Sequence, residues 1–170
     1  MRPASILFAL AIVLAAAPSP AGIVRPAPLA VEDGSGLRVP FDRFLAEGPA
    51  VVHLWATWCA PCLAELPELK GFLDRNPALA ERVLVVSVDT APMARVTGFL
   101  VDRLGLEGMG SLRVVAGNAG MTFGVTAYPS TVFIDGTGAV AARHAGPLDW
   151  SDEAVRLRIE RHLSGVSAPQ

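Results

Sequence analysis

Two cysteines, Cys59 and Cys62, stand three positions apart where the sequence changes from one hydrophobic pattern to another. The apolar run at residues 50–54 is rich in β-branched side chains, and such a run predicts a buried strand. Leucines then recur at helical spacing and mark one apolar face: Leu63, Leu66, Leu69 and Leu73. The chain must therefore place both cysteines where a buried strand passes into the first turn of a helix.

The first turn of a helix makes a cysteine reactive. Its free N–H groups and positive dipole end stabilise a thiolate, which is the reactive form of the side chain. Residues i and i+3 of such a turn also lie within disulfide reach. Cys59 is nearer the junction and is predicted to be the more exposed, attacking thiol. Cys62, one turn further on, is predicted to be the buried thiol that resolves a mixed disulfide, and Pro61 stiffens the turn between them.

The string Trp58-Cys59-Ala60-Pro61-Cys62 after a strand resembles the active site of the thioredoxin superfamily. Its continuation through Glu65 and Pro67 resembles the TlpA/ResA/CcmG branch of exported bacterial proteins. The resemblance covers about residues 37–163 and implies an α/β, thioredoxin-like three-layer fold, with a mixed central sheet and helices on both faces. The remaining patterns follow the same order: strands at 82–88, 112–116, 130–134 and 139–144, and helices beginning near Asp89, Ala119 and Ser151.

Length and composition fit one globular domain. The chain has 170 residues, of which 52% are hydrophobic, and a formal net charge of −2. It therefore offers no basic surface for nucleic acid. We expect a targeting segment at 1–21, a linker at 22–36, the thioredoxin-like domain at 37–164 and a tail at 165–170.

The N-terminal segment has the pattern of an export signal. Arg2 precedes an uninterrupted apolar stretch at residues 6–17, and Ser19-Pro20-Ala21 provides a small-residue cleavage site. The apolar stretch is shorter than the roughly 20 residues that span a bilayer, which favours a cleaved signal peptide. The alternative is an uncleaved anchor running on towards Val24. Either way the domain is expected in the periplasm or another extracytoplasmic space, secreted or anchored to the inner membrane.

Export bears on the role of the cysteine pair. Exported proteins that rely on structural disulfides usually carry several separated cysteines. This chain has 2, and they close a loop too short to stabilise the fold much. The pair is therefore predicted to be redox-active, and no cofactor other than the Cys59–Cys62 disulfide is expected.

Four residues are candidates for substrate binding: Trp58, Tyr128, Pro129 and, in the turn between the two cysteines, Pro61. By resemblance, Pro129 is the cis-proline that faces the cysteines in thioredoxin-like proteins, the alternative being a trans turn proline. The backbone of Tyr128 would then offer a substrate peptide a short pairing edge, and its bulky side chain would alter substrate preference. Trp58, beside the nucleophile, is either a flat apolar patch for docking partners or a core aromatic.

Two residues are candidates for handling protons. Glu65 follows Cys62 by three residues, and the family has a glutamate at this position. A partly buried carboxyl group there would have a raised pKa and could carry the proton of Cys62, whereas a solvated surface glutamate would not. His53 departs from the family, in which an aspartate or a small polar residue is usual. It is either a core residue or a titrating group that tunes Cys62, a proton-relay candidate.

Other uses of a Cys-x-x-Cys pair fit less well. Haem attachment needs a histidine after the second cysteine, where Leu63 stands, and a structural zinc site needs four ligands. A thiol peroxidase of the peroxiredoxin type would want a threonine three residues before the reactive cysteine, where Ala56 stands. A copper-handling metallochaperone of the same fold would want three residues between its cysteines and a distant histidine, but two thiols can bind Cu(I) transiently, so it stays an alternative.

The resemblance therefore implies a thiol–disulfide oxidoreductase that reduces disulfides of specific exported proteins. It would be of the type that acts in cytochrome c maturation or in copper-site assembly. Its partners would be protein disulfides and, as the source of electrons, a membrane thiol-electron transporter.

Overall fold

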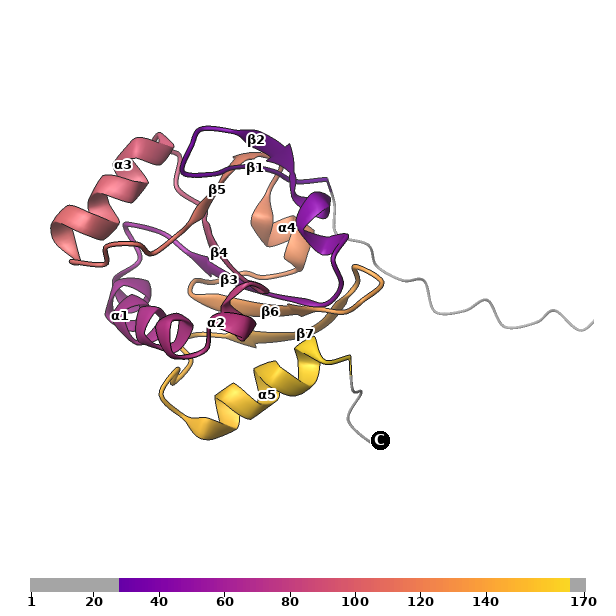
Figure 1. Cartoon of the computed structure of the whole chain (residues 1–170). Coiled ribbons are helices and arrows are strands. Elements are labelled where there is room, and N and C mark those ends of the chain that lie inside the picture. The colour runs from indigo at the N-terminus through magenta and orange to yellow at the C-terminus, as the bar shows by residue number, and fades with distance from the viewer. Residues whose placement is uncertain (1–27, 166–170) are drawn as a thin grey trace, which may run out of the picture.

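The computed structural model describes residues 28–165, so the targeting segment expected at 1–21 lies outside the described residues. Figure 1 shows strands gathered in one sheet with helices around it. The elements follow in chain order: β1 (Ala30–Glu32), β2 (Arg38–Pro40), the 3₁₀ turn η1 (Phe41–Leu45), β3 (Ala50–Trp55), α1 (Ala60–Arg75), α2 (Pro77–Ala80), β4 (Val83–Ser87), α3 (Met93–Gly98), the π-helical turn η2 (Phe99–Arg103), β5 (Leu112–Ala116), α4 (Ala119–Phe123), β6 (Ser130–Ile134), β7 (Val140–Ala145) and α5 (Glu153–Leu163).

The sheet is mixed, as expected. Its strands lie in the order β2-β1-β5-β4-β3-β6-β7. The central strand β3 runs parallel to β4 and antiparallel to β6. Every residue of β3 is buried, which is why this strand has a continuous apolar sequence rather than an alternating one.

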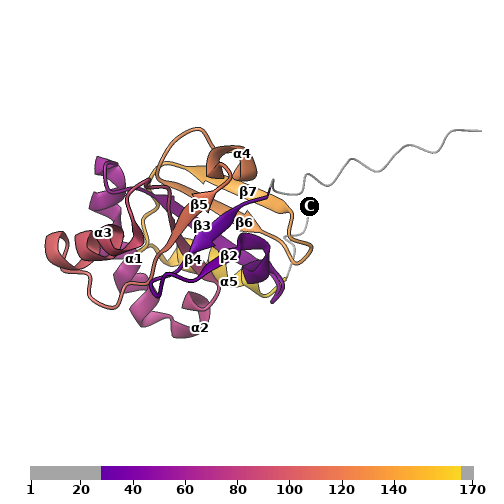
Figure 2. The ribbon, with the colours of Figure 1, turned by 90° about the horizontal axis from the view of Figure 1, so that it is seen from above.

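Side chains alternate along each strand, so the two faces of the sheet have separate cores. Val51 and Trp55 of β3 pack with residues of α1, α3 and α5. Val52 and Leu54 pack with residues of η1 and α4. Figure 2 shows α1 and α4 on opposite sides of the sheet. The predicted three-layer, thioredoxin-like α/β fold is confirmed.

The linker predicted at residues 22–36 is wrong for its C-terminal part. Ala30–Glu32 forms β1, which lies inside the sheet between β2 and β5. Val31 is fully buried, and Glu32 pairs with Arg113 of β5. A three-residue strand with one buried side chain is too short to show a period of two, so the sequence pattern does not reveal it. The folded domain therefore begins before residue 37.

Two local features add to the expected order. The chain forms the short helix α2 directly after α1, and α3 continues into the π-helical turn η2.

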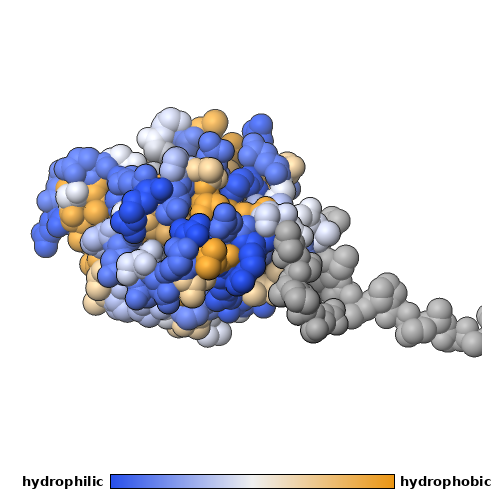
Figure 3. All heavy atoms as spheres, turned by 60° about the horizontal axis from the view of Figure 1, so that its bottom comes forward, coloured by the Kyte–Doolittle hydropathy of each residue, from blue (hydrophilic) through white to orange (hydrophobic). Residues whose placement is uncertain are grey.

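Within residues 28–165, no helix combines the length and apolar character needed to cross a bilayer. The face drawn in Figure 3 is mostly hydrophilic, with apolar residues in small groups between polar ones.

Candidate active site

The two cysteines form a disulfide at the junction of β3 and α1, with their Cα atoms 5.2 Å apart. Cys59 is the N-cap residue of α1, and its Sγ accepts a hydrogen bond from the backbone N–H of Cys62 at 3.3 Å. Cys59 is 6% exposed and Cys62 is fully buried. The order of exposure is the predicted one. Because the N-terminus of α1 points at the Cys59 sulfur, the site can stabilise a thiolate there.

An aromatic pair borders the disulfide loop. Trp58 is 66% exposed, and its ring meets the ring of Tyr128 edge to face, with the centroids 6.0 Å apart. The Tyr128–Pro129 bond is cis, as predicted, and Ser130 Oγ donates to the carbonyl of Ala127 in the same turn. The structure thus excludes a core position for Trp58 and brings the loop before Pro129 next to the loop before Cys59.

Glu65 is buried, which excludes the surface alternative. Its Oε1 accepts hydrogen bonds from the backbone N–H of Leu148 and from the indole Nε1 of Trp150. Burial raises the pKa of the Glu65 carboxyl, and these two hydrogen bonds act against that shift. Glu65 lies one turn after Cys62 on the same face of α1.

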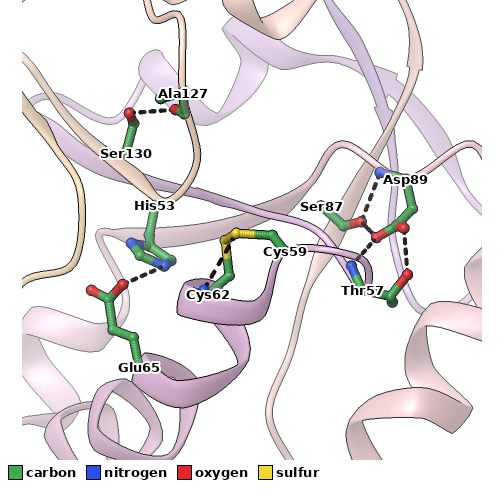
Figure 4. The surroundings of a disulfide bond; sticks show 9 residues. All are labelled: His53, Thr57, Cys59, Cys62, Glu65, Ser87, Asp89, Ala127 and Ser130. Atoms are coloured by element: carbon green, nitrogen blue, oxygen red, sulfur yellow. Dashed lines mark hydrogen bonds and ion pairs between the residues drawn. A yellow bond between two sulfur atoms is a disulfide. The ribbon is translucent and has the colours of Figure 1, made fainter.

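His53 is fully buried on β3. Its Nδ1 lies 3.1 Å from Thr131 Oγ1 on β6, and its Nε2 lies 3.9 Å from Glu65 Oε2. Burial lowers the pKa of His53 to about 3. The imidazole is therefore neutral at ordinary pH, and Figure 4 shows it pointing toward the Glu65 carboxyl group.

Three residues that complete this buried polar group were not predicted: Trp150, Leu148 and Thr131. They lie between 78 and 85 residues away in sequence from the side chains they contact. The sequence held one signal for Trp150, since a buried carboxyl group needs hydrogen-bond donors and tryptophan supplies an N–H within an apolar body.

In the part of the chain that the structure describes, no group of three or more acidic, His or Cys side chains is arranged to hold a metal ion.

Comparison with known proteins agrees with this geometry. The Redoxin family model matches residues 26–157, which is most of the chain. The chain belongs to the Redoxin family. This confirms the predicted membership of the thioredoxin superfamily.

Redoxin relatives and a solved structure extend the comparison. The thiol:disulfide interchange protein HelX of Rhodobacter capsulatus is 34% identical over 150 residues, covering 84% of this chain and 78% of HelX. The thiol:disulfide interchange protein DsbE of Xylella fastidiosa is 34% identical over 105 residues, covering 62% of this chain and 51% of that protein. The chain thus spans about half the length of this second relative. The crystal structure of the exposed lipoprotein thioredoxin Etrx1 of Streptococcus pneumoniae has a TM-score of 0.61 at 21% identity, covering 79% of this chain and 99% of Etrx1. That likeness shows the shared fold.

Proposed function

We propose that this protein is a thiol–disulfide oxidoreductase that reduces disulfides in specific exported proteins. The observation that carries the proposal is the Cys59–Cys62 disulfide, closed between the N-cap residue and the first turn of α1. The similarity to HelX, a thiol:disulfide interchange protein, supports the same chemistry.

The proposed reaction is a two-step exchange. The Cys59 thiolate attacks one sulfur of a substrate disulfide, and the other substrate sulfur leaves as a thiolate. Cys62 then loses its proton and attacks the Cys59 sulfur of the mixed disulfide, which closes Cys59–Cys62 and releases the second substrate thiolate. Two electrons and two protons pass to the substrate. No bound cofactor takes part, and a dithiol donor must afterwards reduce the Cys59–Cys62 disulfide again.

Glu65 and His53 would handle the proton of Cys62. A carboxyl group with a raised pKa can accept a proton as Cys62 becomes a thiolate and return it when Cys62 is released as a thiol. His53 Nε2 faces this carboxyl group from β3. In this role His53 is a positioning residue that acts through Glu65.

Trp58, Tyr128 and Pro129 would bind the substrate. The exposed ring of Trp58 offers an apolar surface beside the nucleophile. The cis Tyr128–Pro129 bond precedes β6, where the backbone of Tyr128 can pair with an extended segment of the substrate. Pro61 keeps the turn between the two cysteines stiff.

We further propose an extracytoplasmic location and a membrane thiol-electron transporter as the dithiol donor. The export signal expected at residues 1–21 supports this location. A reductase in an oxidising compartment needs electrons delivered across the membrane. The substrates proposed are apocytochrome c or proteins with a thiol-ligated copper site, since both must keep cysteine pairs reduced before they bind haem or metal.

A trapping experiment tests the exchange. Cys62→Ser should hold a substrate as a mixed disulfide on Cys59, because the resolving thiol is gone, and Cys59→Ser should hold none. Adducts formed in the cell envelope that produces the protein are separated on non-reducing gels and identified by mass spectrometry. Apocytochrome c or a copper-site protein among the adducts would identify the substrate class. If Cys62→Ser yields no adduct beyond those of Cys59→Ser, the exchange mechanism is wrong.

A further inference from the structure

Asp89 is a buried carboxylate next to the disulfide loop that the proposed reaction does not use. It follows β4 and is 3% exposed. Its Oδ1 accepts from Thr57 Oγ1 at 2.6 Å, and its Oδ2 accepts from the backbone N–H of Thr57 at 2.9 Å and from Ser87 Oγ at 2.6 Å. Figure 4 shows this group beside Cys59, on the opposite side of the disulfide from His53.

The topology of the sheet explains why these residues meet. β3 and β4 are parallel neighbours, with Trp55 opposite Ser87, so both strands end at the same edge. The backbone N–H of Val88 donates to the carbonyl of Trp55 at 2.9 Å and extends the pairing. The segment that leaves β4 therefore lies against the segment that leaves β3 and carries Thr57.

The bonds to Asp89 are strong enough to fix the loop. Hydrogen bonds to an ionised acceptor are roughly twice as strong as those between neutral groups. Asp89 holds Thr57 by both its backbone and its side chain. Trp58 and Cys59 follow directly, so the position of Thr57 limits where the exposed ring and the sulfur can lie.

We propose that Asp89 is a positioning residue that sets the reactivity of Cys59 by clamping Thr57. This inference rests on the proposed function, because it concerns the same thiol. Cys59 caps α1 only while its sulfur stays over the first turn, where it accepts from the Cys62 N–H. Without the hydrogen bonds between Thr57 and Asp89, the Cys59 sulfur would no longer be held over the first turn of α1. The thiolate would then lose part of the stabilisation from the helix N-terminus.

Thr57→Val tests the clamp without altering the charge of Asp89, since valine has the shape of threonine but lacks the hydroxyl donor. Losing one such bond should slow alkylation of Cys59 in the reduced protein at pH 7 about fivefold. The same factor in the thiol–disulfide equilibrium makes the reduction potential about 20 mV more negative. Thr57→Ser keeps the hydroxyl and should recover most of both losses. Thr57→Ala, expected to match the valine variant, is a second substitution in case valine impairs folding.

Thr137→Val is the matched control. Thr137 donates to Asp135 through its hydroxyl at 2.7 Å and its backbone N–H at 2.8 Å, but it lies in the turn between β6 and β7. The Thr137→Val substitution should change neither the alkylation rate of Cys59 nor the reduction potential of the Cys59–Cys62 pair.

The outcomes separate the two proposals. A reactive wild-type Cys59 together with an unchanged rate and potential in Thr57→Val would overturn the clamp and leave the proposed function standing. Equal shifts in Thr57→Val and Thr137→Val would also overturn the clamp. A wild-type Cys59 that resists alkylation in the reduced protein would overturn the proposed function and the clamp together.

Discussion

His53 and Glu65 face each other between β3 and α1, with His53 Nε2 3.9 Å from Glu65 Oε2. Within residues 28–165, neither of these two buried atoms has a hydrogen-bond partner. Burial lowers the pKa of His53 and raises the pKa of Glu65, so it favours the neutral form of both side chains. A buried ion pair would have to offset the desolvation of two charges. Burial therefore disfavours an ion pair here, and the raised pKa of the Glu65 carboxyl group, one helical turn from Cys62, suits it to exchange a proton with a thiol.

Replacing His53 should make the free energy of unfolding fall less as the pH is lowered. The pKa of His53 is about 3 in the folded protein, below the usual value of about 6.5. As pH falls below 6.5, the unfolded chain binds this proton first, so the wild type loses stability down to pH 3, on the order of a few kcal/mol. His53→Asn should lack this loss. Urea unfolding of the oxidised proteins at pH 7.5, 5.5 and 4.0 measures it.

The Glu65 carboxyl group changes stability with pH in the opposite direction, so its contribution must be measured apart from that of His53. Its pKa is raised, so the folded protein holds this proton more tightly, and stability falls as pH rises from about 4.3 through the folded pKa. The comparison is therefore repeated in a Glu65→Gln background. His144 and Glu68 also act on the charge of Glu65, and the partly buried His144 of β7 provides the control, His144→Asn. If the free energy of unfolding falls between pH 7.5 and 4.0 as much in His53→Asn as in His144→Asn, the prediction is wrong.

Glu65→Gln should slow the second step of the exchange. Glutamine keeps an oxygen that can accept from Leu148 and Trp150, but it cannot take the proton of Cys62. General acid–base catalysis contributes about 10² or more, so we expect closure of the Cys59–Cys62 disulfide from a mixed disulfide to slow roughly tenfold to a hundredfold at pH 7. Rapid-quench analysis of a preformed mixed disulfide measures this step.

The first step provides the internal check on Glu65. Attack by Cys59 does not require the proton of Cys62, so its rate should be unchanged in Glu65→Gln. Asp74→Asn, an exposed change in the last turn of the same helix, should leave both steps at wild-type rates. Equal slowing of both steps in Glu65→Gln would mean that the substitution disturbs the whole site.

Features built from neighbouring residues could be predicted from the sequence. The strand before Cys59, the helix after it and the burial of Cys62 depend on local patterns, and the cis Tyr128–Pro129 bond followed from the resemblance. Features built across the fold could not. The surroundings of His53 depend on Thr131 and Glu65, which come from two other elements. The sequence alone therefore left open whether His53 is a core residue.

Trp58→Ala should weaken substrate binding without weakening the fold. Trp58 is 66% exposed and its ring contacts Tyr128, so the loss of the ring should change the free energy of unfolding by only about 0.5 kcal/mol. Removing an aromatic anchor from an interface costs more than about 1 kcal/mol of binding, which predicts a KM for a protein disulfide raised roughly tenfold. Steady-state kinetics measure it. Met121→Ala, at a residue 79% exposed, is the control, and an equal rise in its KM would remove any special role of Trp58.

Gly117→Ala should show that the missed strand β1 belongs to the folded domain. Gly117 has φ +84, and a Cβ there would lie 2.5 Å from the carbonyl oxygen of Pro28, a backbone atom that leads into β1. Gly105 also has a positive φ, +65, but among the described atoms nothing lies within 4 Å of its added Cβ. Both alanine variants carry the left-handed backbone penalty of about 1–2 kcal/mol. Only Gly117→Ala must also displace the chain before β1, so urea unfolding should show a larger loss, and equal losses would mean that this segment contributes little to stability.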